Sequence, residues 1–249
     1  MTDLLVLDDV GKSFGALRAV DGVSFSVAAG EVLGIAGPNG SGKSTLFNII
    51  TGIPFRPDRG AITFAGERIE RLAPHLIARR GIARTFQTET DFETLSVEDN
   101  MLTALAQRRD GLGHGERVRE ARRLLEFVGV AASPDRTAGE ISVFDRKKLM
   151  IATALALRPK LLLLDEPASG LSQPEVEGTI ALIRAINATG VAIVLIEHVI
   201  SLLMSVSARL VVLNFGSVLA SGDPVDVVRD PRVVEAYLGA GAGRDLAAA

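Results

Sequence analysis

Short apolar runs alternate with longer segments of helical periodicity along most of this chain. Residues 23–27 (VSFSV) alternate apolar and polar positions in the manner of a half-buried strand, and glycines separate such stretches within residues 1–30. Residues 31–37 (EVLGIAG) form a nearly continuous apolar run that ends in a glycine-rich turn, which predicts a buried strand. The residues KSTLFNIITG that follow the turn predict a helix ending at Gly52.

The second half of the chain repeats a strand-and-helix order. Residues 61–66 (AITFAG) predict a further strand, and residues 98–157 are mostly helical in pattern. The segments KLLLLDEP, PEVEGTIALIRAI, VAIVLIEH and VISLLMSV then predict strand, helix, strand and helix. Because apolar runs joined by helix-length segments are typical of βαβ units, we predict an α/β core with a parallel sheet.

We expect one domain over residues 1–249 with a helical subdomain inserted in its middle. The core is predicted at about 1–87 and 158–238, and the helical subdomain at about 88–157. Residues 239–249 (GAGAGRDLAAA) are rich in small side chains, which predicts a flexible tail.

Composition narrows the class of protein. A chain of 249 residues with 47% hydrophobic residues can bury a sizeable core. A net charge of -3 and only 4% aromatic residues argue against nucleic acid as a partner. The absence of cysteine excludes disulfides and thiolate metal sites. The longest apolar runs fall far short of the roughly 20 residues that cross a bilayer, so we expect a soluble, cytoplasmic protein.

A phosphate-binding loop is the most specific motif. Residues 37–45 (GPNGSGKST) fit the pattern G-x-x-x-x-G-K-[ST] and lie between a predicted strand and a predicted helix. Its glycines let successive backbone N–H groups point at phosphate oxygens, and the helix dipole adds to the attraction. Lys43 is expected to reach the β- and γ-phosphates of a nucleotide, and the Ser44 hydroxyl to bind Mg²⁺. The predicted nucleotide-binding residues of the loop are Gly37, Pro38, Asn39, Gly40, Ser41, Gly42, Lys43, Ser44 and Thr45.

A pair of acidic residues follows the next buried strand. The run LLLLDEP brings Asp165 to the carboxyl end of its strand, where ligands lie in open α/β sheets. Asp165 is suited to a Mg²⁺ contact, and Glu166 to polarising an attacking water. We therefore predict nucleotide hydrolysis with ATP and Mg²⁺ as the bound cofactors.

Several motifs together resemble one branch of the P-loop proteins. No Asn-Lys-x-Asp of the kind that reads guanine in GTPases occurs in the chain. The segments GPNGSGKSTLFNIITG, RTFQ, LALRPKLLLLDEPASGL and IEH, in this order and spacing, resemble an ABC-type ATPase over essentially the whole chain. RTFQ, IEH and the ending LASGDPVDVVRDPRVVEAYLG are similar to the ATP-binding subunits of branched-chain (hydrophobic) amino acid uptake transporters. The resemblance implies a P-loop NTPase core with an N-terminal antiparallel β subdomain.

The resemblance also implies roles for three residues outside the loop. Phe14 resembles the aromatic residue that stacks on adenine. Gln87 resembles the glutamine that touches Mg²⁺ and the attacking water and communicates with the membrane subunit. His198 resembles the histidine that senses the γ-phosphate. Ser172 stands where the family often has an aspartate in the loop that meets the partner ATPase.

The signature motif departs from the family pattern. In the family, Leu-Ser-Gly-Gly-Gln at a helix N-terminus holds the γ-phosphate bound by the opposite subunit. This chain has ISVFD at residues 141–145, so Ser142 is kept while Val143 and Phe144 replace glycines and Asp145 adds a negative charge. We predict a weak signature and therefore a heterodimer with an ATPase whose signature is intact, although a homodimer stays open.

The predicted function is to hydrolyse ATP and thereby energise a bacterial importer for branched-chain or related amino acids or small polar solutes. The implied partners are a second ATPase, membrane permeases and, indirectly, a periplasmic or extracellular solute-binding protein. The expected location is peripheral, on the inner face of the cell membrane. Three alternatives stay open: the ATPase of a lipid or lipopolysaccharide exporter, a soluble ABC ATPase, and a binding or regulatory module that no longer hydrolyses ATP.

Overall fold

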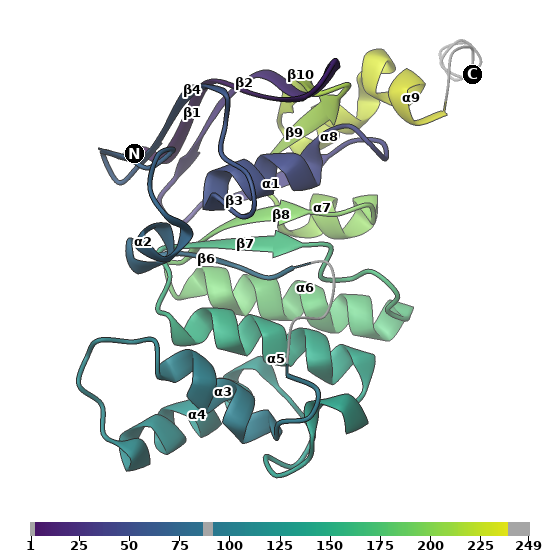
Figure 1. Cartoon of the computed structure of the whole chain (residues 1–249). Coiled ribbons are helices and arrows are strands. Elements are labelled where there is room, and N and C mark those ends of the chain that lie inside the picture. Colours follow the sequence, from purple (N-terminus) through teal and green to yellow (C-terminus); the bar gives the residue numbers. More distant parts are fainter. Residues whose placement is uncertain (1–2, 87–91, 239–249) are drawn as a thin grey trace.

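Two β-sheets and the helices around them make up the fold (Figure 1). The structure is a computed structural model that describes residues 3–86 and 92–238. Gln87 and the predicted tail at 239–249 lie outside these described residues.

The first sheet is antiparallel and has four strands in the order β2-β1-β4-β5. Its strands are β1 (Asp3–Phe14), β2 (Leu17–Ala28), β4 (Arg59–Phe64) and β5 (Glu67–Arg68). The strand predicted at 61–66 ends two residues early, because Ala65 and Gly66 adopt positive φ angles of 49° and 82° and form the turn into β5. The predicted antiparallel β subdomain is confirmed.

The second sheet has six strands in the order β10-β9-β3-β8-β7-β6. Its strands are β3 (Val32–Ala36), β6 (Ile82–Arg84), β7 (Leu161–Asp165), β8 (Ala192–Ile196), β9 (Arg209–Asn214) and β10 (Ser217–Gly222). All neighbouring strands are parallel except β9 and β10, which pair as a hairpin. Ile196 is opposite both Ile35 and Asp165, so the carboxyl ends of β3, β8 and β7 lie at one edge of the sheet.

Helices cover both faces of the six-stranded sheet. The described helices are α1 (Lys43–Thr51), α2 (Pro74–Arg79), α3 (Val97–Leu105), α4 (His114–Val128), α5 (Val143–Ala156), α6 (Gln173–Ala188), α7 (Ile200–Val206), α8 (Pro224–Arg229) and α9 (Pro231–Leu238). Figure 1 shows α1 between the two sheets, α5 and α6 on the opposite face, and α3 and α4 beyond them. The helices predicted after the phosphate-binding loop and after β7 and β8 are confirmed.

Two apolar clusters pack on the two faces of this sheet. Along β8, Ile193 and Leu195 belong to the cluster under α5 and α6, whereas Val194 and Ile196 belong to the cluster that holds α1 and the antiparallel sheet. Strand residues point alternately to either face, so a strand buried on both sides reads as a continuous apolar run. Within the described residues, no helix has the length and apolar character to span a bilayer.

Candidate functional site

The phosphate-binding loop joins the buried strand β3 to helix α1. Gly37 and Gly42 have φ angles of 147° and 103°, a region that side chains rarely adopt. A Cβ at Gly37 would lie 2.2 Å from the carbonyl oxygen of Leu213, and one at Gly42 would lie 2.2 Å from that of Ala19. Glycine is therefore required at both positions, because the loop is pressed against neighbouring backbone.

Lys43 is held inside this loop. Its side chain starts from the first residue of α1, and the residue is 6% exposed. The Nζ atom donates hydrogen bonds to the carbonyl oxygens of Gly37 at 2.7 Å and Pro38 at 2.9 Å. Burial lowers the pKa of the ammonium group, and the carboxylates of Glu166 and Asp165 oppose that effect. The Lys43 ammonium group therefore lies inside the curled loop and near the carboxylates of Glu166 and Asp165.

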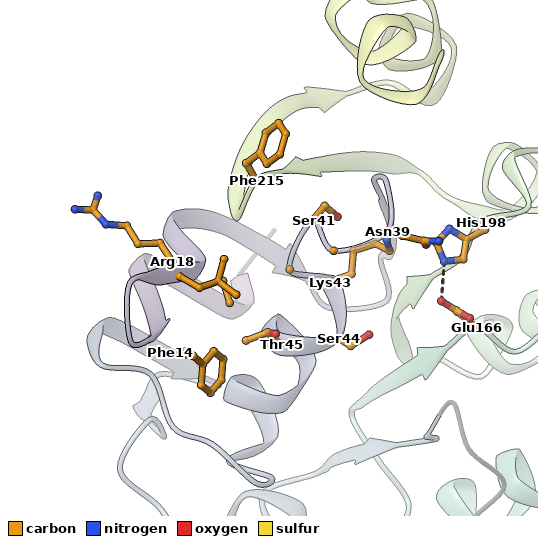
Figure 2. Close-up of a pocket in the computed structure, with 14 residues that line it drawn as sticks. Phe14, Arg18, Asn39, Ser41, Lys43, Ser44, Thr45, Glu166, His198 and Phe215 are labelled. Atoms are coloured by element: carbon orange, nitrogen blue, oxygen red, sulfur yellow. Dashed lines mark hydrogen bonds and ion pairs between the residues drawn. The ribbon is translucent and has the colours of Figure 1, made fainter. Parts of the chain in front are cut away.

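A cleft of about 810 Å³ opens along the loop. It is lined by Phe14, Leu17, Arg18, Ala19, Asn39, Gly40, Ser41, Gly42, Lys43, Ser44, Thr45, Glu166, His198 and Phe215. Figure 2 shows Glu166 and His198 on one side of the loop and Phe14 and Arg18 on the other. Gly37 and Pro38, although predicted to bind nucleotide, are not among the lining residues.

Four lining residues were not predicted from the sequence: Leu17, Arg18, Ala19 and Phe215. The first three begin β2, and Phe215 lies in the turn between β9 and β10. The Phe215 side chain is 87% exposed, and Figure 2 shows it on the far side of Ser41 from the helix α1. In the sequence, Phe215 stands before the turn residue Gly216, and this pattern alone does not indicate a ligand-binding residue.

Phe14 lies at the surface and not in the core. It is 39% exposed and meets Phe55 edge-on, with 4.9 Å between the ring centroids. The Lys12 ammonium lies 5.5 Å from the centre of the Phe14 ring. A ring exposed at the cleft can stack on a planar ligand, which is the role that the sequence predicts for it.

Glu166 and His198 meet at the edge of the cleft. The Glu166 Oε1 atom is 2.7 Å from His198 Nε2, although the two residues follow different strands (Figure 2). Glu166 is 8% exposed and has a φ angle of 50°. A positive φ in a residue with a side chain is strained, and such strain is concentrated at functional sites. The structure therefore brings together two of the three predicted catalytic residues.

Asp165 pairs with a residue to which the sequence analysis assigned no role. Its Oδ2 atom accepts a hydrogen bond of 2.7 Å from Arg84, and the two side chains are 1% and 6% exposed. The Arg84 guanidinium also donates to Asn48 at 2.7 Å. Burial raises the pKa of Asp165, and the Arg84 charge opposes that effect.

The other carboxylate oxygen of Asp165, Oδ1, is buried and has no hydrogen-bond partner within the described residues. A carboxylate oxygen and a serine hydroxyl are the hard donors that Mg²⁺ prefers. Asp165 and Ser44 therefore fit the cation predicted from the sequence. In residues 3–86 and 92–238, no three His, Asp or Glu side chains gather as a metal site of their own.

Glu197 is a buried acid that sequence reasoning passed over, although it stands inside the motif IEH. It is 1% exposed, and its carboxylate accepts hydrogen bonds from the N–H groups of Ala168 at 2.6 Å, His198 at 3.1 Å and Val199 at 3.4 Å. Burial raises the pKa of Glu197. Glu197 thus ties the segment after Glu166 to the segment that carries His198.

Comparison of the sequence with known protein families identifies the family of this chain. Residues 20–169 match the family described as ABC transporter, and residues 217–243 match the one described as branched-chain amino acid ATP-binding cassette transporter. The chain belongs to the ABC transporter family. The predicted ABC-type ATPase, its branch and its P-loop NTPase fold are confirmed.

Individual ABC proteins are similar over nearly their full length. The chain is 36% identical to the high-affinity branched-chain amino acid transport ATP-binding protein BraF of Pseudomonas aeruginosa, over 95% of this chain and 98% of that protein. It is 35% identical to the lipopolysaccharide export system ATP-binding protein LptB of Acidithiobacillus ferridurans, over 96% and 98%. A crystal structure of an ATP-binding cassette of an ABC transporter in its ADP conformation has a TM-score of 0.87 and 33% identity, covering 96% of this chain and all of that one.

The predicted signature residues lie at the start of helix α5, where Ser142 is the N-cap. Ser142 Oγ accepts a hydrogen bond of 3.0 Å from the Asp145 backbone N–H. The Asp145 carboxylate accepts from Ala131 N–H and Lys148 Nζ, both at 3.3 Å. Val143 is 50% exposed. None of the four predicted signature residues is among those that line the cleft of their own subunit.

Phe144 is half-buried, and its ring packs against its own subunit. Lys148 Nζ lies 3.8 Å from the ring centre, and a Cβ at Gly178 of α6 would lie 3.0 Å from the ring Cζ. The ring therefore fills the space that a glycine on α6 leaves. The steric argument against this signature is weaker than the sequence suggested, because the bulk of Phe144 is directed at α6.

Proposed function

We propose that this chain hydrolyses ATP to drive a bacterial importer of branched-chain or related amino acids or small polar solutes. The hydrogen-bonded pair of Glu166 and His198 at the edge of the P-loop cleft carries the proposal. Relatives named as branched-chain amino acid transport ATP-binding proteins support the choice of cargo. The permeases and a solute-binding protein select the cargo, so this chain supplies energy and no solute specificity.

In this proposal, separate groups of residues bind the phosphates, the adenine and the metal ion. The P-loop N–H groups and Lys43 bind the phosphates, and Phe14 stacks on the adenine. Ser44, Gln87 and Asp165 would hold Mg²⁺, which would supply positive charge to neutralise the transferred phosphoryl group. 

Glu166 orients the attacking water and accepts its proton, and His198 contacts the γ-phosphate. The 2.7 Å contact between their side chains fixes both groups relative to each other. The strained φ angle of 50° at Glu166 accompanies a side chain that lines the cleft.

The assembly that we propose has two ATPases beneath membrane permeases, at the inner face of the cell membrane. We propose a heterodimer, because Asp145 adds a negative charge to the signature and Phe144 replaces a glycine of the family motif. A double change, Phe144→Gly with Asp145→Gln, should then raise the ATPase rate of the assembled transporter. An unchanged rate would rule out a weak signature and favour a homodimer.

The central experiment uses Glu166→Gln, which keeps the shape of the side chain and removes its basicity. Turnover should fall roughly a hundredfold or more while ATP binding is retained. Glu67→Gln is the matched control, since Glu67 is 64% exposed in a surface pair with Arg80. Normal turnover of Glu166→Gln would overturn the assignment of the general base.

The same variant identifies the transport system. A tagged Glu166→Gln chain should be isolated with ATP from detergent-solubilised membranes, and the co-purifying proteins identified. Permeases of an uptake system, with or without a second ATPase, are the expected result. The similarity to LptB makes a lipopolysaccharide exporter the second candidate, and co-purification of exporter subunits would favour it.

A further inference from the structure

The C-terminal helix α9 reaches the start of the P-loop. The Gly37 backbone N–H donates a hydrogen bond of 2.6 Å to the hydroxyl oxygen of Tyr237, which lies 200 positions later in the chain. Gly37 directly follows β3, and its carbonyl oxygen accepts from Lys43. The backbone N–H and the backbone C=O of Gly37, at the entrance of the loop, are thus held by Tyr237 and by the loop lysine respectively.

The sequence of α9 explains why Tyr237 points inward. Val233 and Tyr237 are four positions apart and so lie on one face of the helix. Val233 is 5% exposed and belongs to the apolar cluster under α5 and α6. Asp230 caps the helix by accepting the Arg232 backbone N–H at 2.9 Å. Packing of Val233 therefore fixes α9 where the phenol of Tyr237 meets Gly37.

The contact is well suited to hold the loop. Tyr237 is 37% exposed, and the part of it that is buried raises the pKa of its phenol. A phenol is neutral at physiological pH even at its usual pKa, so its oxygen can accept the Gly37 N–H. Figure 2 shows the loop curling around Lys43 beneath Phe215. Gly216 N–H adds a second restraint, a hydrogen bond of 3.1 Å to the carbonyl oxygen of Ser41. The loop is thus fastened at its first residue by α9 and in its middle by the turn between β9 and β10.

We propose that Tyr237 is a positioning residue for nucleotide binding, which fixes the Gly37 peptide and so couples the docking of α9 to the shape of the P-loop. The inference rests on the nucleotide binding proposed above. A preformed loop binds phosphate more tightly than one that must be ordered on binding. Coupling is reciprocal, so bound nucleotide must also favour the docked position of α9.

The test compares nucleotide affinity in the full chain with Tyr237 and with Tyr237→Phe. The change removes one oxygen and leaves the Gly37 N–H without its acceptor, so the Kd for Mg-ADP should rise roughly tenfold by calorimetry. In turnover assays KM should rise with little change in kcat, because Tyr237 does not touch the reacting atoms. Ser205→Ala is the control, since its exposed hydroxyl donates a hydrogen bond to the Ser201 carbonyl oxygen of its own helix.

A second readout uses the composition of the chain. The chain contains one tyrosine, so replacement of tyrosine by 3-fluorotyrosine gives a single fluorine NMR signal, from Tyr237. That signal should shift when Mg-ADP is added. An unchanged signal at saturating Mg-ADP, or an unchanged Kd in a correctly folded Tyr237→Phe chain, would overturn the inference. Failure of the unaltered chain to bind Mg-ADP would instead overturn the proposed function.

Discussion

At the scale of single residues, the buried pair of Arg84 and Asp165 is the main electrostatic feature beside the cleft. Arg84 is the counter-ion of a carboxylate that is 1% exposed, and it leaves only the Oδ1 atom of Asp165 available for a metal. A buried charge that loses its partner is far more costly than a buried pair. The side chain of Arg84 is therefore expected to serve stability as well as the orientation of Asp165.

Arg84→Ala should destabilise the protein by about 3–5 kcal/mol, measured as the free energy of unfolding in urea. Replacing both partners, Arg84→Met with Asp165→Leu, should restore most of this loss because no buried charge remains. Arg122→Ala is the control, since its side chain is 63% exposed in a surface pair with Glu98, and its unfolding midpoint should stay near that of the unaltered protein. An Arg84→Ala protein as stable as the Arg122→Ala protein would contradict the argument.

The residues of the site were predictable from sequence to unequal degrees. The P-loop, Asp165 and Glu166 could be found because a local motif follows a buried strand in each case. The pairs Arg84–Asp165 and Gly37–Tyr237 join positions 81 and 200 residues apart, and each pair depends on how the sheet is ordered. No local pattern encodes such contacts, so they emerge only from the fold.

At the scale of helices, the contact between α5 and α6 explains how the altered signature is accommodated. The Phe144 ring packs against Gly178, as a large residue packs against a small one in a close-packed interior. Sequence patterns predicted both helices, but not that a glycine in α6 makes room for the ring. Periodicity shows which face of a helix is apolar and not which residue it meets.

The packing predicts non-additive effects on stability. Alone, Gly178→Ala gains helix propensity but brings a Cβ within 3.0 Å of the Phe144 ring, so little net stabilisation is expected. Phe144→Ala should cost about 1–3 kcal/mol. In the Phe144→Ala background, Gly178→Ala should stabilise by roughly 1 kcal/mol, which a double-mutant cycle in urea would measure.

Gly115 in α4 provides the matched control for this cycle. A Cβ there has only the Arg119 guanidinium as a neighbour, at 3.8 Å. Gly115→Ala should therefore have the same effect with and without Phe144→Ala. Additive effects at Gly178 as well would mean that the ring and α6 are not in contact in solution.

At the scale of the whole molecule, the sequence predicted the α/β core, the antiparallel β subdomain and the helices of the middle segment. It did not predict α2, β6, β9, β10, α8 or α9 as elements. β6 has only three residues, and its place at the sheet edge depends on pairing with β7 rather than on its own pattern. Residues 219–239, which include most of β10 and all of α8 and α9, contribute to the prediction only through their resemblance to a family, and β9 precedes them.

Those C-terminal elements bring the last part of the described chain to the P-loop. β9 pairs with β3, the strand that leads into the P-loop, and α9 follows β10 and α8 to reach Gly37. Residues 217–243 also match the family described as branched-chain amino acid ATP-binding cassette transporter. The part of the chain that identifies its branch thus includes a residue that contacts the P-loop shared by the wider family.

This arrangement predicts that nucleotide binding slows local opening of α9. By reciprocal coupling, saturating Mg-ADP should slow amide hydrogen exchange in α9 several-fold, up to about tenfold, because the docked helix becomes more populated. Exchange in α4, which Figure 1 places at the opposite end of the molecule, should not change. In Tyr237→Phe the protection of α9 should largely disappear even when nucleotide is saturating. Equal exchange in α9 with and without Mg-ADP would show that the C-terminal helix is only an anchor, and that Tyr237 stabilises the fold without acting on the loop.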